Sequence, residues 1–228
     1  MADYRVVWSA EPGIDLLTGP AVVVRAFYES SVGALFGGSA DFLYPGFDHA
    51  VPRDAPPPAP KRPVGEKPYP YPLVGTDRNH ILRIETSGTN VTAVFCNWGY
   101  GVTDDLGDGK FGFHGPPGNP AYEPIFAEWL ALTPPPGGST PLPPQHGPAP
   151  APVDDVFGGW RVTQRLAGGP DDTKVPAEWP TMIDDANTCV ATAPEPRERR
   201  QFLRQGVHPR SDFPTLAPFP GWPAGSVQ

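Results

Sequence analysis

The sequence predicts an α+β fold, in which a long N-terminal helix packs on a curved antiparallel sheet and proline-rich arms extend from it. Proline and glycine account for 35 and 26 of the 228 residues, which is too many chain-breaking residues for a helical bundle or a coiled coil. Hydrophobic residues make up 39% and aromatic residues 11%, which is too much apolar surface for a wholly disordered chain. One segment of helical periodicity precedes several strand-like runs, so we expect the helix to cover one face of the sheet.

The chain is expected to divide into three parts. Residues 1–17 form an N-terminal strand or arm, residues 18–206 a single α+β domain, and residues 207–228 a proline-rich C-terminal strap. Proline-rich loops interrupt the domain at 52–72 and 134–152. Because proline lacks the backbone N–H that a sheet ladder needs, we predict extended connectors in these two loops.

The long helix is predicted over residues 18–36. Thr18 suits the N-cap position, Pro20 suits the first turn, and apolar residues then recur at helical spacing until Gly37 ends the helix. A shorter helical stretch is expected over residues 39–51.

Four strands are expected, at residues 73–84, 90–100, 125–132 and 156–166. The first two flank a Thr-Ser-Gly-Thr turn and should form an antiparallel hairpin. Residues 103–119 are predicted to be a loop rich in glycine and aspartate. A last helix is expected at 194–205, where Thr192 precedes it and Gly206 ends it.

A candidate ligand pocket follows from the alternation of side chains along the first strand. Strict alternation places His80, Leu82 and Ile84 on one face, which we predict to be the core face. Two tryptophans from other strands, Trp98 and Trp160, complete the candidate pocket. The helical stripe expected to cover this face consists of Val23, Ala26, Phe27, Ser30 and Ala34.

No motif in the sequence indicates catalysis, a cofactor or a metal site. The chain lacks the GxSxG, HExxH, phosphate-loop and dinucleotide-binding patterns, and no two histidines lie three or four residues apart. We therefore predict no catalytic residue, no cofactor and no metal, and no constellation of a base, a nucleophile and oxyanion donors in a single cleft. His80 is interpreted as a core histidine, and the alternative is a small NTF2-like hydrolase or isomerase that uses His80 or the Asp48–His49 pair.

The charge balance limits the classes of partner. Seventeen lysines and arginines against 25 acidic residues give a net charge of −8, so there is no basic surface that predicts nucleic-acid binding. No run of 18 apolar residues predicts a membrane span, and the first residues do not have the pattern of an export signal.

The two cysteines leave two interpretations open. Cys96 lies in a strand-like run and Cys189 in a polar stretch that we predict to be a loop. A disulfide between them would fasten the C-terminal segment to the sheet, whereas two unpaired thiols would make Cys96 a small buried apolar residue.

The C-terminal strap carries a regular apolar pattern. Phe213, Leu216, Phe219 and Trp222 follow one another at intervals of three residues, which is the period of a polyproline II helix. We predict that all four lie on one side of the strap and dock into an apolar groove, either on this domain or on a partner.

A resemblance to a known family rests on six segments: DYRVVWSAEPGIDL, YPGF at 44–47, LVGTDRNHIL, TAVFCNWGYG, DDVFGGWRV and RRQFLRQGVHPRSDFPTLAPFPGWP. They resemble a family of uncharacterised mycobacterial proteins, often secreted or lipoprotein-like, with related copies in mycobacteriophages. The resemblance implies an origin and transfers no functional residue. The element order is also similar to the NTF2-like or cystatin-like cone, which implies a concave face for a small ligand or a partner.

These observations favour a non-catalytic module that binds a protein partner or a small ligand. The resemblance implies a setting in the mycobacterial cell envelope, or outside the cell if a signal segment has been removed. The alternative is a structural protein of a phage particle, made in the cytoplasm and built into a larger assembly. The sequence predicts no oligomeric state.

Overall fold

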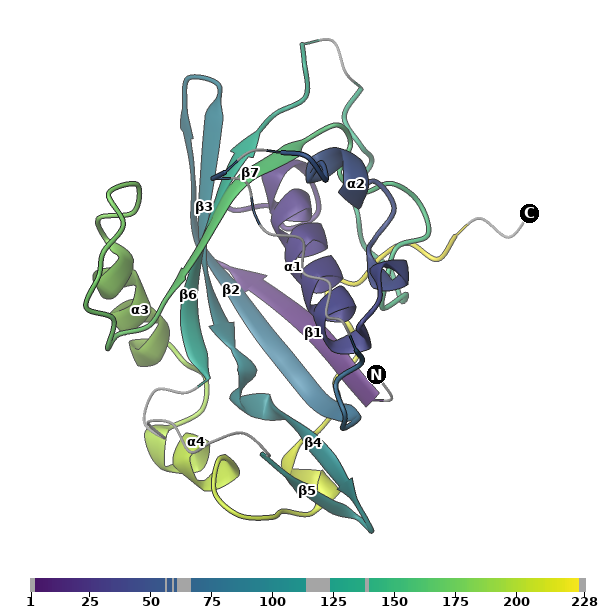
Figure 1. Cartoon of the computed structure of the whole chain (residues 1–228), viewed down its shortest axis with the longest axis vertical. Coiled ribbons are helices and arrows are strands. Elements are labelled where there is room, and N and C mark those ends of the chain that lie inside the picture. The colour runs from purple at the N-terminus through teal and green to yellow at the C-terminus, as the bar shows by residue number, and fades with distance from the viewer. Residues whose placement is uncertain are drawn as a thin grey trace.

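One curled sheet dominates the computed structural model, which describes residues 3–55, 57–58, 60, 67–113, 124–137 and 140–225 (Figure 1). In the described residues the sheet has seven strands, in the order β5-β4-β2-β3-β6-β7, with β1 added alongside β2. The strands are β1 (Asp3–Ala10), β2 (Leu73–Ser87), β3 (Asn90–Trp98), β4 (Val102–Gly107), β5 (Lys110–Gly112), β6 (Ile125–Thr133) and β7 (Arg161–Gly168). The fold is therefore α+β with a curled half-barrel sheet, which is compatible with a cone-like fold.

The pairing of the strands is antiparallel except at β1. β1 runs parallel to β2, from Asp3 opposite Val74 to Ala10 opposite Ile81. The prediction of a wholly antiparallel sheet is wrong at this pair. A long connection that includes a helix separates β1 from β2, and such a crossover lets two strands run in the same direction.

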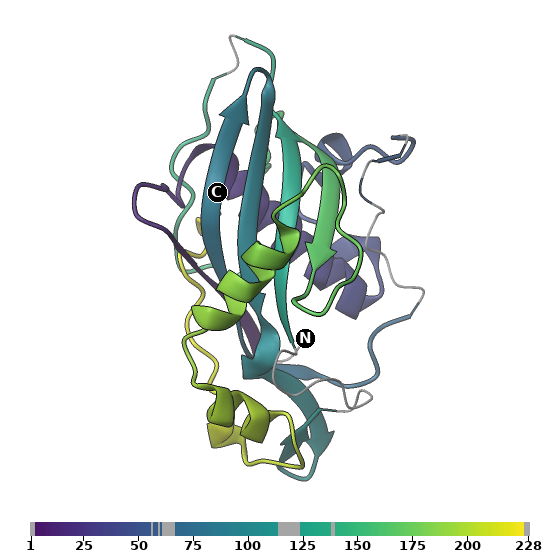
Figure 2. The same ribbon diagram turned by 90° about the vertical axis from the view of Figure 1, so that its left-hand side faces the viewer.

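Helices cover both faces of the sheet. α1 (Gly19–Gly37) and α2 (Phe47–Ala50) lie on one face, and α3 (Met182–Ala191) lies on the other (Figures 1 and 2). α4 (Arg197–Leu203) follows α3 and packs near the end of β3. We call the two sides of the sheet the α1 face and the α3 face.

α1 occupies the residues where the sequence predicts the long helix. Gly38 ends it in a left-handed conformation, with φ of 64°, and the Gly38 N–H donates to the Ala34 carbonyl at 3.0 Å. Thr18 stands at the N-cap position, but its hydroxyl donates to Asp15 at 2.6 Å and makes no cap bond. Most of α1 is buried all round, because the sheet and the proline-rich segments enclose it.

Each face of the sheet has its own apolar core. The core of the α1 face joins α1 to Ile81, Phe95 and Leu130 of the sheet. The core of the α3 face joins the buried side of α3 to Trp98 and Trp129. Because both faces are covered, apolar residues at odd and at even strand positions are buried alike.

The predicted alternation of side chains along β2 is wrong, because a β-bulge interrupts the strand. The pairing of β2 with β3 shifts register between Ile81 and Arg83. Leu82 consequently packs on the core of the α3 face, whereas Ile84 packs on the core of the α1 face. α1 therefore does not cover a face that carries both Leu82 and Ile84; among the β2 residues that it covers is Ile81, which is fully buried.

Three further predictions of local structure are wrong. Part of the expected loop at 103–119 forms β4 and β5, and residues 114–119 lie outside the described part of the chain. Residues 156–160 are not a strand, since β7 begins at Arg161. Cys189 lies in α3 and not in a loop. Met182, Ala186 and Cys189 recur at helical spacing and form the buried side of this short, otherwise polar helix.

The C-terminal segment is fastened to the domain at several points. Cys96 of β3 and Cys189 of α3 form a disulfide with an S–S distance of 2.02 Å. The strap then runs along the open edge of β1, where the Trp8 N–H donates to the Phe219 carbonyl at 2.8 Å. The strap thus lies on its own domain in this structure.

The four apolar residues of the strap do not share one side. Phe213 is buried in the core of the α3 face and Trp222 in the core of the α1 face. Leu216 and Phe219, by contrast, are 39% and 61% exposed. The predicted polyproline alignment is wrong because the strap crosses the edge of the sheet from one core to the other.

Among the described residues, no helix combines the length and the apolar character needed to cross a membrane.

Candidate functional site

The structure does not bring the five predicted pocket residues together. His80, Leu82 and Trp98 lie on the α3 face, and the rings of His80 and Trp98 stack with centroids 5.6 Å apart. Ile84 and Trp160 pack on the core of the opposite face. The prediction fails because of the bulge at Leu82 and because both faces of the sheet are buried.

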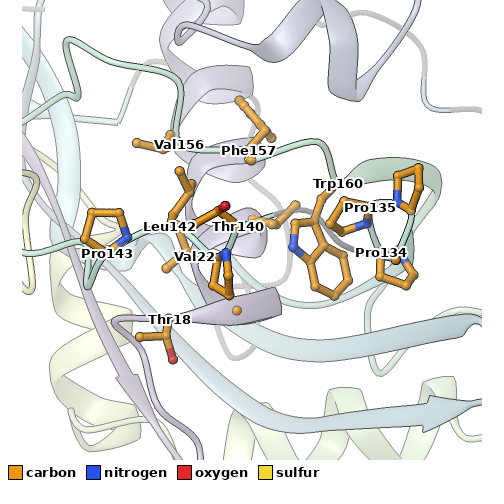
Figure 3. Close-up of a pocket in the computed structure, with 16 residues that line it drawn as sticks. Thr18, Val22, Pro134, Pro135, Thr140, Leu142, Pro143, Val156, Phe157 and Trp160 are labelled. Carbon is orange, nitrogen blue, oxygen red and sulfur yellow. The ribbon is translucent and has the colours of Figure 1, made fainter.

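Trp160 does line a cavity on the α1 face, which we call the apolar cavity (Figure 3). It has a volume of about 440 Å³ and lies between the first turns of α1 and the proline-rich residues at 134–137 and 140–143. Its walls include Val22, Leu142 and Phe157. None of the described residues that line it carries a titratable side chain, so it offers apolar contact and few orienting groups.

A second cavity on the α1 face has a polar deep end, and we call it the polar-floored cavity. It has a volume of about 200 Å³ and lies between α1, β1 and the strands β2 to β4. Six buried polar residues line it, namely Tyr4, Tyr28, Asp77, Asn97, Thr103 and Asp104. Less buried aromatic residues line the rest, namely Phe36, Tyr69 and Phe113.

Asp77 is the centre of the hydrogen bonds in this cavity. Tyr4 of β1 and Tyr28 of α1 donate their hydroxyls to Asp77 Oδ2 at 2.8 and 2.7 Å. The Asn97 side chain of β3 donates to Asp77 Oδ1 at 2.6 Å and also lies 2.7 Å from the Tyr28 hydroxyl. Side chains from three other elements, β1, α1 and β3, therefore hold this β2 carboxyl group, which is 4% exposed.

The fold explains why a charged side chain is buried at this position. Asp77 precedes the bulge, so it points to the same face as Asn79 and Ile81, which is the face that α1 covers. Burial raises the pKa of Asp77, and the hydrogen bonds from Tyr28, Tyr4 and Asn97 act against that rise. Removal from water is thus the larger influence on this carboxyl group.

Thr103 adds a polar group that lacks a partner. It belongs to β4 and is 3% exposed, and its hydroxyl makes no hydrogen bond with any described residue. A buried hydroxyl without a partner costs free energy, so a group that bonds to it would be stabilising.

Two further charged residues line the cavity, the buried Asp104 and the partly exposed Arg204. The Tyr69 hydroxyl donates to Asp104 Oδ2 at 3.2 Å. The Arg204 guanidinium lies 3.3 Å from the centre of the Phe113 ring. The lining of the cavity is therefore charged as well as aromatic.

The predicted histidine sites have different surroundings. The Ser9 hydroxyl lies 2.8 Å from His80 Nδ1, and Glu11 lies 3.3 Å from His80 Nε2. Ser9 lines a cavity that His80 does not line, so the expectation that no base, nucleophile and oxyanion donors share one cleft stays a prediction. Asp48 and His49 are exposed on α2, where Asp48 lies 3.5 Å from Arg53.

The described residues hold no group of three or more histidine, cysteine, aspartate or glutamate side chains placed to bind a metal ion. Sequence reasoning also missed the polar-floored cavity. One signal was available, since Asp77 is an acidic residue within an otherwise strand-like run. Tyr4 and Tyr28, however, approach Asp77 only in the folded chain.

Comparison of this chain with protein-family models, with curated proteins and with solved structures found no match. The resemblance to mycobacterial proteins therefore stays a prediction, and the function has to be argued from the cavities.

Proposed function

We propose that the protein is a non-catalytic ligand-binding module and that its ligand occupies the polar-floored cavity. The observation that carries this proposal is the pairing of a buried carboxyl group with an unpartnered hydroxyl, Asp77 and Thr103, in one cavity with aromatic walls. Small-molecule sites commonly combine apolar walls with a few fixed polar groups.

The size of the cavity limits the ligand. Drug-sized ligands occupy roughly 300–1,000 Å³, and this cavity has about 200 Å³. A molecule with a single ring or a short aliphatic chain is the appropriate size. The apolar cavity is larger, but it has no comparable set of polar groups to select one ligand over another.

Filling the cavity tests the proposal. Val32 lines the cavity, and a Val32→Trp variant should occupy much of its volume. A fragment screen by protein NMR should find ligands that shift the amide signals of Asn97 and Thr103 in the native chain. Val32→Trp should abolish these shifts.

The matched control is Val153→Trp, because Val153 is 59% exposed and lies away from this cavity. It should bind as the native chain does. Failure of all fragments to shift signals around the cavity would overturn the proposal, as would binding that survives Val32→Trp.

One observation favours a second candidate, a hydrolase that uses His80. With Nδ1 unprotonated, His80 accepts a hydrogen bond from the Ser9 hydroxyl and donates from Nε2 to Glu11, which is the arrangement of an activated serine. The Asn79 carbonyl, 3.4 Å from the same hydroxyl, is the competing acceptor. Ser9 lines a cavity of about 450 Å³ between β1, β2 and the strap. A fluorophosphonate probe should then label the native chain but not a Ser9→Ala variant, and an unlabelled native chain would remove this candidate.

The setting of the molecule is part of the proposal. The mycobacterial resemblance supports a place in the cell envelope or in a phage particle, and the exposed Leu216 and Phe219 give a protein partner an apolar contact. A Leu216→Ser/Phe219→Ser double variant should lose that partner and keep its fold.

A further inference from the structure

The buried acidic residues of this protein differ in how their charge is balanced. Glu128 lies 2.6 Å from Arg165, and Asp185 lies 2.5 Å from Arg83. Each of these carboxylates therefore has a guanidinium partner, which offsets the cost of removing a charge from water.

Glu29 also has a cation nearby. It accepts hydrogen bonds from Trp8 and Trp222 at 2.8 and 2.6 Å. The positive charge of Arg25 favours its ionised form and acts against the rise in pKa that burial causes.

Asp77 has no such partner. No lysine, arginine or histidine in the described part of the chain forms an ion pair with it, and its hydrogen bonds come only from neutral side chains. It is one of two buried carboxyl groups that line a cavity open to a small molecule, the other being Asp104, which is 2% exposed and accepts a hydrogen bond from Tyr69. Glu128, Asp185 and Glu29 thus have cationic partners within the protein, whereas a cation for Asp77 has to come from a ligand.

The walls of the same cavity suit a positive charge. Phe36, Tyr69 and Phe113 line it together with the rings of Tyr4 and Tyr28. The face of an aromatic ring attracts a cation, most strongly where water is excluded. Among the described lining residues, two carboxyl groups, Asp77 and Asp104, face one guanidinium, Arg204, which already lies over the Phe113 ring. The rings of Phe36 and Tyr69 and the excess of acidic groups therefore suit an organic cation.

We infer that the ligand of the polar-floored cavity is a small organic cation, a primary amine that carries one ring or a short aliphatic chain. This inference rests on the proposed function and adds the class of ligand to it. The ammonium group donates to Asp77, and the Thr103 hydroxyl accepts a second ammonium hydrogen. The apolar part of the amine lies along the aromatic walls.

A metal ion fits this cavity less well. The described residues include no cluster of three metal-ligating side chains, and a hard cation prefers several oxygen ligands to aromatic rings. An anion is disfavoured because both acidic residues that line the cavity, Asp77 and Asp104, would repel it.

The inference predicts a dependence of binding on pH. Burial raises the pKa of Asp77, so at low pH the carboxyl group is protonated and attracts an ammonium group weakly. Binding should strengthen as the pH rises through that pKa and weaken again only when the amine itself loses its proton.

Other ionisable groups surround the Asp77 carboxyl group, but they do not change the direction in which cation binding depends on pH. Tyr4 and Tyr28 have pKa values raised well above 10.0, mainly by burial, so both stay neutral as Asp77 titrates. Farther away, Glu29 also gains negative charge as the pH rises, which favours a cation. On the remaining sides the charged groups are the paired Glu128 and Arg165, together with Asp104 and Arg204 of the cavity lining.

The experiment compares two probes of nearly the same shape, phenethylamine and 2-phenylethanol, by calorimetry on the full chain at neutral pH. The amine should bind at least about tenfold more tightly than the alcohol, because a charged hydrogen bond exceeds a neutral one by about that factor. Asp77→Asn should remove that advantage and leave binding of the alcohol within about threefold. Asp154→Asn, which removes the same charge from an exposed site, should change neither affinity.

Each outcome has a separate meaning. Equal or tighter binding of the alcohol, unaffected by Asp77→Asn, would overturn the cation inference and leave the proposed binding site in place. Failure of both probes to bind would overturn the cation inference by itself, and the fragment screen then decides the site. If Asp77→Asn does not fold, the native chain is used for the test. Its affinity for the amine must fall as the pH is lowered, while its affinity for the alcohol must stay constant.

Discussion

Two buried carboxyl groups on opposite faces of the sheet, Asp185 and Asp77, differ in how their charge is balanced. On the α3 face, Asp185 receives two hydrogen bonds from Arg83, and the Cys96–Cys189 disulfide joins α3 to β3. On the α1 face, Asp77 is buried beside a cavity with hydrogen bonds from neutral donors only. Asp185 is thus balanced by a guanidinium within the protein, whereas Asp77 keeps a buried charge that costs stability and that a ligand can offset.

The strap links the two faces, and its removal should have the largest effect. A chain that ends at Gln205 loses Phe213 from one core and Trp222 from the other. Loss of one buried aromatic side chain costs about 3–5 kcal/mol, and a domain has about 5–15 kcal/mol in total. We expect the cooperative thermal transition, followed by near-ultraviolet circular dichroism, to be lost.

The control for this deletion is a chain that ends at Ala224, which keeps Trp222 and should melt like the native chain. If the chain ending at Gln205 melts at the native temperature, the strap does not stabilise either core.

A single substitution in the α1 core should have the next largest effect. Phe27 is 2% exposed and stacks on Phe47 with ring centroids 5.9 Å apart. Phe27→Ala should lower the free energy of unfolding by about 3–5 kcal/mol in denaturant titrations. Leu35→Ala is the control, since Leu35 on the same helix is 51% exposed. Equal effects of the two substitutions would contradict the assigned core.

On the α3 face, the Cys96–Cys189 disulfide links α3 to the sheet covalently. Replacing Cys96 and Cys189 together by alanine should cost about 4 kcal/mol, because the bridge closes a long loop in the unfolded chain. Chemical denaturation with and without reductant measures the same quantity. Binding of the amine probe should survive in the folded fraction, and loss of binding from folded protein would show that the two faces are not separate in function.

A smaller effect should appear in the pH dependence of stability. Because the pKa of Asp77 is raised above 3.8 in the folded chain, the folded state binds more protons than the unfolded state as the pH passes between the two values. The native chain should therefore lose stability relative to Asp77→Asn as the pH rises across that interval. Each unit of displacement is worth about 1.4 kcal/mol. If the difference in stability between the native chain and Asp77→Asn stays constant with pH, the pKa of Asp77 is the same in the folded and the unfolded chain.

The sequence predicted the elements with strong local signals better than it predicted their contacts. The long helix and the hairpin at β2 and β3 lie where periodicity and turn residues place them. The side-chain faces could not be predicted, because a bulge at Leu82 reverses the alternation and leaves no mark in the sequence. Short elements such as α3 and β5 form mainly through tertiary contacts.

The candidate site could not be predicted from the sequence either, because its residues are distant from one another along the chain. Its parts come from β1, α1, β2, β3 and β4, and only the folded sheet brings Tyr4 to Asp77, 73 residues away. The sequence directed attention to His80 and to strap residues such as Phe219, since histidines and regular apolar spacing are conspicuous. An aspartate in a strand carries no comparable signal.

The most direct test of the difference between the two faces is a carboxyl-carbon NMR titration that follows Asp77 and Asp185 in the same sample. We predict that the pKa of Asp77 lies above the ordinary value of 3.8, because burial outweighs its neutral hydrogen-bond donors. Asp185 should titrate below 3.8, because its bonds from Arg83, Trp179 and Thr181 outweigh the opposing effect of burial. Saturation with phenethylamine should lower the pKa of Asp77 and leave that of Asp185 unchanged. An Asp77 that titrates at or below 3.8 in the free protein would contradict the account.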